Sequence, residues 1–254
     1  QVDLLSLDTK EQLGHNDIVA RIKKAASDDH IKGIYLDLST LQGGLATIEE
    51  IRNALLEFKK SGKFILAYSE VYSQGGYYLA SVADKIYLNP EGIIDFRGYS
   101  SEIAFFKGTL DKLDIEAQVI KVGTFKSAVE PFILDRMSDP NRKQVTAFLG
   151  PMYDHFLQGI SSARRIPRDT LQRIAGNALV RSAEDAVHFR LADGLRYKDQ
   201  VLAELKSRSG IQSDRKVRSV GLAEYVPTSE EKSSSASDRV AIVYANGEII
   251  SGEG

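Results

Sequence analysis

"KFILAYSEVYSQGGYYLASVADKIYLN", residues 63–89, contains two short apolar runs separated by a turn and a helical segment. The run at 63–69 predicts a strand, 76–84 predicts a short helix, and 85–89 predicts a second strand that Pro90 closes. Two buried strands joined through a helix are typical of a parallel pair, because parallel strands need a long crossover connection. The stretch therefore predicts an α/β protein.

The same order of elements extends toward the N-terminus. A helix with Asn16 as its N-cap precedes a short apolar strand at 33–38. The next helix is expected to begin with a capping box from Thr47 to Glu50 and to end at Gly62 in the C′ position. The order β-α-β-α-β with nearly continuous apolar strands predicts a mostly parallel sheet that is buried on both sides.

Further elements are expected after Pro90. Residues 103–113 and 115–122 predict a helix and a strand, and a long helix is expected over 139–165 with a kink at Pro151. Three shorter helices are expected at 168–175, 182–191 and 198–207.

The sequence predicts three parts. Residues 1–208 form one domain, and residues 209–238 are a linker because their composition is polar, as in "PTSEEKSSSASD". Residues 239–254 read as the opening strand and turn of a second domain. A lone terminal hairpin would be marginally stable, so the chain is expected to end just inside that second domain.

Composition excludes several classes of site. The formal net charge is −2 and the basic residues form no stripe, which gives nucleic-acid binding no electrostatic support. Cysteine is absent, so disulfides, cysteine-ligated zinc and a thiol nucleophile are excluded. No apolar run is long enough to cross a membrane. The first residue is Gln1, and an N-terminal anchor could precede it.

The histidines do not predict a metal site. His15, His30, His155 and His188 are scattered, and none belongs to a HExxH pattern. We expect them to be structural or solvated, and we expect neither a metal nor a cofactor.

Two glycine-containing turns follow predicted strands. Gly43 and Gly44 could cradle an anion at a helix start, but the loop has no phosphate-binding spacing and is assigned to structure. The second turn, "YSQGG", has the position of a nucleophile elbow. Its elbow residue would be Gln74, which is not a nucleophile, and Ser73 is one position away.

A lone lysine, Lys126, stands in "VIKVGTFKSAVEPF", residues 119–132. A lysine that acts as a general base must be neutral, so its pKa must fall from about 10.4 by roughly 3. Desolvation lowers a lysine pKa, whereas a carboxylate such as Glu130 four residues later would keep the amine charged. Apolar neighbours that could desolvate it are Phe125, Ala128, Val129 and Phe132. The stretch alone favours an ordinary solvated lysine.

Four segments together resemble the amino-terminal half of the long form of signal peptide peptidase A, also called protease IV. They are "LDLSTLQGG", "YSQGGYYLAS", "VGTFKSAVEPF" and "LVRSAEDAVHFRLADGL". The resemblance implies a crotonase-like (ClpP-like) α/β fold, built as a repeated β-β-α and βαβ superhelix. Residues 239–254 would then begin its second repeat.

The resemblance also implies an activity. It implies that the protein is a serine endopeptidase that uses a Ser/Lys dyad to degrade cleaved signal peptides. Lys126 would be the general base, and the nucleophilic serine would lie in a C-terminal half that is not part of this chain. Gln74 fits a degenerate elbow, and Glu130 would turn away from Lys126 to hold the loop. Residues 1–254 alone would be inactive.

Partners and location follow from the resemblance in the same way. It implies peptide substrates, a homotetramer and association with the bacterial inner membrane through a segment outside this chain. The catalytic part would face the periplasm.

Two alternatives stay open. An acyl-CoA enzyme of the same fold would need carboxylate catalysts, and the only acids at predicted strand ends are Asp37 and Asp95. A non-catalytic oligomerisation scaffold would leave Lys126 as a surface residue.

Overall fold

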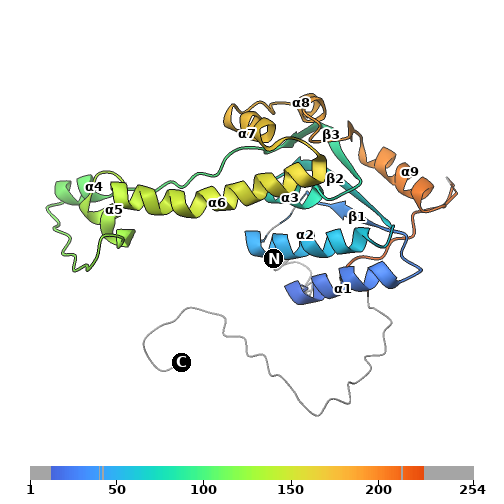
Figure 1. The fold of residues 1–254 in the computed structure, drawn as a ribbon, viewed down its shortest axis with the longest axis horizontal. Helices are drawn as coiled ribbons and strands as arrows, with labels where there is room; N and C mark the ends of the chain where they lie inside the picture. Colours follow the sequence, from blue (N-terminus) through green and yellow to red (C-terminus); the bar gives the residue numbers. More distant parts are fainter. Residues whose placement is uncertain (1–12, 40, 42, 213, 226–254) are drawn as a thin grey trace, which may run out of the picture.

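The computed structural model describes residues 13–39, 41, 43–212 and 214–225 (Figure 1). In this part of the chain, a sheet of four parallel strands has the order β1-β2-β3-β4. The strands are β1 (Gly33–Asp37), β2 (Phe64–Tyr72), β3 (Lys85–Ile94) and β4 (Gly194–Leu195). The predicted α/β class and the parallel sheet are confirmed, while the repeat and the superhelix stay predictions.

Helices precede, connect and follow these strands. They are α1 (His15–Ser27), α2 (Leu45–Lys59), α3 (Gln74–Ala80), α4 (Lys107–Lys112), the 3-10 helix η1 (Ser127–Val129), α5 (Glu130–Ile133), α6 (Asp139–Arg164), α7 (Arg168–Gly176), α8 (Ala183–His188) and α9 (Lys198–Arg208).

Both faces of the sheet are buried, as predicted. Alternate residues of a strand point to opposite faces. Ile65 and Ala67 of β2 belong to the larger core, to which α2, α3, α6, α7 and α8 contribute. Leu66 packs on the other side with Val201 and Leu205 of α9. The continuous apolar run in β2 therefore reflects burial on two sides.

The prediction that Pro90 closes the third strand is wrong, because β3 continues to Ile94. The β2–β3 pairing jumps from Ser69↔Leu88 to Val71↔Ile93. The residues between these pairs, Pro90 included, are left out of register, so the missing N–H of proline costs no ladder bond.

Two predicted N-caps are also wrong. Asn16 and Thr47 lie inside helices whose N-caps are Gly14 and Gly44. The main-chain carbonyls of these glycines already accept the first helical hydrogen bonds, at 3.1 and 3.0 Å, so each helix begins before the polar residue. Gly62 has a left-handed φ of 78° and follows the end of α2.

After β3 the chain leaves the sheet and returns along α6, which forms a projecting arm with α4 and α5 at its far end (Figure 1). We call residues 97–155 the arm. The helix α6 has 26 residues and continues through Pro151, which gives a length of about 39 Å.

The predicted strand at 115–122 is wrong. These residues form no strand, and Ile120 and Val122 are 101% and 86% exposed. Within the described residues no neighbouring strand offers them a hydrogen-bonding edge. A β-like sequence does not form a strand without such a partner.

The segment after α9 packs back on α1. Arg21 Nη1 donates to the carbonyl oxygens of Leu222 and Ala223 at 2.6 and 2.7 Å. The Tyr225 hydroxyl donates to Asp28 Oδ2 at 2.8 Å. The remainder of the predicted linker and residues 239–254 lie outside the described residues, so the domain boundaries stay predictions.

No helix in the described ranges is both long and apolar enough to span a membrane.

Candidate functional site: the lysine turn

Lys126 lies directly before η1, between α4 and α5, at the end of the arm (Figure 1). We call residues 123–133 the lysine turn. It begins at Gly123, whose φ of 95° is left-handed, and it continues through η1 into α5. Lys126 itself is exposed.

The apolar neighbours that could desolvate Lys126 do not cover it in the described part of the chain, which agrees with the solvated lysine that the stretch alone favours. Phe125 and Phe132 are 55% and 47% exposed, and the Phe132 ring stacks on Phe106 with 6.2 Å between centroids. Among the described residues, no hydrogen bond or ion pair holds the Lys126 amine. The amine is therefore available to a group from outside the described residues.

Glu130 turns away from Lys126, as the resemblance implied. Its side chain is only 3% exposed and accepts three hydrogen bonds from the start of α6. Ser138 Oγ donates at 2.5 Å, the Ser138 main-chain N–H donates at 3.3 Å, and Asn141 Nδ2 donates at 2.9 Å. Glu130 thus joins the start of α5 to the start of α6.

These contacts lower the pKa of Glu130. The hydrogen bond from the Ser138 side chain is the main cause, burial opposes it, and Asn141, the Ser138 N–H and the positive charge of Lys121 add to the lowering. Donors stabilise the ionised form of a carboxyl group. Glu130 is therefore a carboxylate at neutral pH, and it is engaged with its donors.

Sequence reasoning missed Ser138 and Asn141. Ser138 is the N-cap of α6, and its Oγ accepts the Asn141 N–H at 3.2 Å. The signal was present, because a serine followed by Asp139 and Pro140 is typical of a helix start.

The other end of α6 is fixed to the body of the protein. Arg52 Nη2 of α2 donates to the Gly159 carbonyl at 2.8 Å. Glu49 of α2 accepts from the Tyr78 hydroxyl at 2.6 Å and lies 3.1 Å from His155 Nε2. The place of the lysine turn relative to the sheet is therefore set through α6.

The two glycine turns have structural roles. Ser73 is the N-cap of α3, and its Oγ accepts the Gly76 N–H at 3.1 Å. Gln74 begins α3 two residues after the last residue of β2, and its Oε1 accepts the Arg97 N–H at 3.2 Å. Gly44 is the N-cap of α2, and Gly43 precedes it. The turn from β2 into α3 is therefore present, but the side chain of Gln74, the residue in the elbow position, is not a nucleophile.

The two acids considered for acyl-CoA chemistry are both paired with cations. Asp37 Oδ2 accepts from Lys198 at 3.0 Å, and Asp95 lies 2.6 Å from Arg97 Nε. Burial raises the pKa of Asp37, but the hydrogen bonds from Lys198 and Ser39 outweigh it, so the pKa is lowered. Neither carboxylate is poised as a free acid or base.

Three histidines each lie beside one acid: His15 with Glu50, His30 with Asp28, and His155 with Glu49. Within the ranges that the structure describes, no group of three or more histidine, aspartate or glutamate side chains could hold a metal ion.

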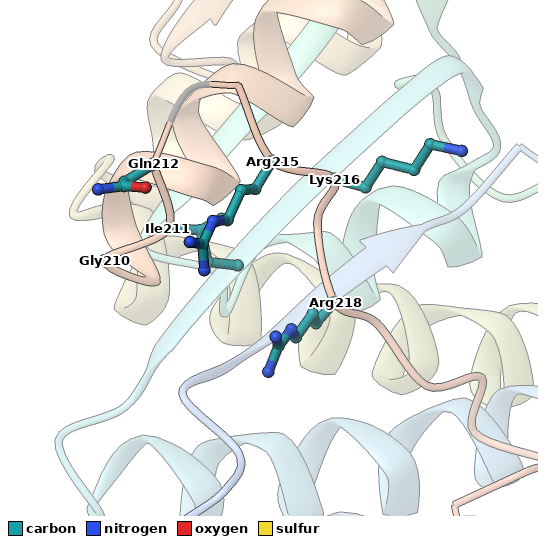
Figure 2. Close-up of a pocket in the computed structure, with 6 residues that line it drawn as sticks. All are labelled: Gly210, Ile211, Gln212, Arg215, Lys216 and Arg218. Carbon is teal, nitrogen blue, oxygen red and sulfur yellow. The ribbon is translucent and has the colours of Figure 1, made fainter.

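Figure 2 shows the residues that line a pocket just after the end of α9. In Figure 1, α9 lies on the opposite side of the molecule from α4 and α5, which flank the lysine turn. In Figure 2, Lys216 points away from Arg215 and Arg218. The pocket is lined by Gly210, Ile211, Gln212, Arg215, Lys216 and Arg218. It contributes nothing to the surroundings of Lys126.

The structure is that of an α/β protein with a parallel sheet, and the sequence matches a class of peptidases. Residues 57–212, which include the elbow and the lysine turn, match the family described as peptidase family S49. The chain belongs to peptidase family S49.

The resemblance to protease IV is confirmed by individual relatives. The chain is 35% identical over 250 residues to Protease 4 of Salmonella typhi, which covers 93% of this chain and 39% of that protein. It is 36% identical over 251 residues to Protease 4 of Haemophilus influenzae, and the matched region covers 93% of this chain and 40% of that protein. It is 31% identical over 228 residues to the chloroplastic serine protease SPPA of Arabidopsis thaliana, and the matched region covers 89% of this chain and 34% of that protein. The chain thus spans about two fifths of the length of the two bacterial relatives.

Proposed function

We propose that this chain is the amino-terminal part of a serine endopeptidase that degrades cleaved signal peptides, with Lys126 as the general base. The nucleophilic serine would come from residues outside the chain. Membership of family S49 and the names of the relatives support a serine protease. The observation that carries the assignment of Lys126 is that no described residue pairs with its amine, because the carboxylate nearest to it in sequence, Glu130, is engaged elsewhere.

The proposed reaction has two halves. Neutral Lys126 accepts the proton of the serine hydroxyl while the serine oxygen attacks the peptide carbonyl carbon. The lysine ammonium then gives this proton to the leaving amine, the C–N bond breaks, and an acyl-enzyme remains. Water releases the acyl group, with Lys126 again accepting and returning a proton.

A neutral lysine requires a desolvated site. Because Lys126 is exposed in this chain, the surface that covers it would belong to the rest of the protein or to another subunit. The arm is suited to being covered, since it exposes several large apolar side chains and such surfaces mark interaction sites. They include Phe106, Leu113, Ile115, Ile120, Val122, Phe125, Phe132 and Phe148.

The wider assignment is part of the same proposal. The whole protein would bind peptides, form a homotetramer and associate with the bacterial inner membrane through a segment outside this chain, with its catalytic part facing the periplasm. The net charge of −2 gives no support for a nucleic-acid partner.

The test compares the full-length protein that contains this chain with its Lys126→Ala variant on a short apolar peptide. We expect turnover to fall by about 10²–10⁴-fold or more, the usual contribution of general-base catalysis. Lys112→Ala, an exposed lysine on the same arm, is the matched control and should keep normal turnover. Circular dichroism and oligomer size should be unchanged in both.

Near-normal turnover of Lys126→Ala would refute the assignment and would favour the scaffold alternative. Residues 1–254 alone are expected to be inactive. Hydrolysis of a peptide ester by this chain alone would refute the placement of the nucleophile outside it.

A further inference from the structure

We propose that Glu130, Ser138 and Asn141 are positioning residues that fix Lys126 for catalysis. This inference rests on the proposed function, because it concerns the same lysine. Among the described residues, Glu130 forms no ion pair with Lys126. Instead, hydrogen bonds between Glu130 and the other two side chains join the lysine turn to the start of α6.

Burial shows that this polar cluster is the core of the arm. From residue 97 to residue 155, only Glu130 and Asn141 are buried. No apolar side chain is fully buried in this described stretch, so the lysine turn has only the half-exposed Phe106–Phe132 stack beside its buried polar contacts. A buried carboxylate is costly unless donors satisfy it, and here three donors do so.

The cluster connects the lysine turn to a rigid element. Glu130 follows η1 directly and begins α5, while its three donors belong to Ser138 and Asn141 at the start of α6. Other ties are few: the Phe106 N–H donates to the Pro131 carbonyl at 2.7 Å, which links the turn to α4. Loss of the carboxylate would thus free the turn from α6.

Position matters because proton transfer depends on distance and direction. A displacement of about 1 Å can reduce catalysis about 10²-fold. Since α6 is anchored to the body at Gly159 through Arg52, the cluster connects that anchor to the lysine turn. Disruption of the cluster should move the lysine while the sheet and its helices stay folded.

The experiment measures kcat and KM of the full-length protein and its Glu130→Ala and Glu130→Gln variants. We expect Glu130→Ala to lower kcat by about 10–100-fold with little change in KM, because the turn is misplaced. Glu130→Gln should stay within about threefold of wild type. Its amide oxygen can accept from Asn141 and the Ser138 N–H, and its NH₂ group can donate to Ser138 Oγ.

A second pair of variants separates positioning from loss of stability. Ser138→Ala removes a donor to Glu130 and also the N-cap of α6, whereas Ser182→Ala removes only the N-cap of α8. Each should lower the urea midpoint of unfolding, because each helix loses its cap. Only Ser138→Ala should also lower kcat, by about 3–10-fold.

The outcomes are distinguishable. If Lys126→Ala is inactive but Glu130→Ala and Ser138→Ala keep normal kcat, this inference is wrong and the proposed function stands. If Glu130→Gln is as impaired as Glu130→Ala, the carboxylate acts through its charge, and positioning by hydrogen bonds is refuted. If Glu130→Ala does not fold, the comparison of Ser138→Ala with Ser182→Ala decides.

Discussion

Replacement of Gly159 by alanine tests how α6 is anchored to the body of the protein. A Cβ atom at this position would lie 2.6 Å from Tyr78 Cε2 and 2.7 Å from the Tyr78 hydroxyl. The ring cannot move aside easily, because Tyr78 is only 4% exposed and its ring is in contact with two other side chains. Arg52 Cζ lies 4.6 Å from the centroid of the Tyr78 ring, and the centroid of the Phe156 ring lies 5.3 Å from it. The extra methyl group must therefore displace Tyr78 or the helix.

The size of the effect follows from three contributions. Overpacking costs about 1–3 kcal/mol, and loss of the Tyr78–Glu49 hydrogen bond to a charged acceptor costs about 1.5–3 kcal/mol. Alanine recovers about 1 kcal/mol of helix propensity relative to glycine. The net loss in the free energy of unfolding is about 1.5–5 kcal/mol.

The assay is urea unfolding of the full-length protein, followed by circular dichroism. The matched control is Gly176→Ala at the end of α7, where a Cβ would have no atom within 4 Å. We expect the control to be neutral or slightly stabilising. Equal stability of Gly159→Ala and Gly176→Ala would refute the close packing of α6 on Tyr78.

Three further predictions concern other parts of the fold. Gly92→Ala should lower the stability by about 1–3 kcal/mol or more, because its Cβ would lie 2.4 Å from a main-chain carbonyl oxygen of β2. Thermal unfolding measures this loss, and an unchanged Tm would contradict the close approach of β2 and β3 at the jump in their register. Tyr225→Phe should speed tryptic cleavage at residues 215–218 severalfold, because the segment loses its hydrogen bond to Asp28; unchanged cleavage would show that this bond does not hold the segment. The pKa of Glu130 in the folded state lies below its usual 4.5. The carboxylate therefore contributes to the free energy of unfolding above pH 4.5, and this contribution is lost as the pH falls through the pKa of the folded state. Between pH 5 and pH 3 the Tm of the wild type should therefore fall further than the Tm of Glu130→Gln. Equal changes of Tm with pH in the two proteins would refute the lowered pKa.

The strands of the sheet could be predicted from the sequence because they are buried on both faces. Apolar side chains then occur at every position, as in 64–68, and this run is visible without knowledge of the neighbours. The helix starts were predicted less well. Asn16 and Thr47 have the right chemistry for caps, but main-chain geometry at Gly14 and Gly44 started the helices earlier.

The segment at 115–122 shows a different limit. Its alternating apolar residues have strand propensity, but a strand forms only where another strand offers hydrogen-bonding groups. The described residues offer none there. For the same reason β3 could continue past Pro90, because its partner β2 supplied a register in which the proline is not paired.

The sequence by itself determined the α/β class, the parallel strands and the lysine motif, since these depend on local apolar patterns and on the order of residue types within a short stretch. Only the tertiary structure decided the surroundings of Lys126. It left the lysine exposed and gave Glu130 to Ser138 and Asn141, which lie eight and eleven residues further along the chain. Which donors lie within hydrogen-bonding distance of a carboxylate depends on the course of the backbone. That course is fixed by the packing of whole helices, which a short stretch of sequence does not reveal.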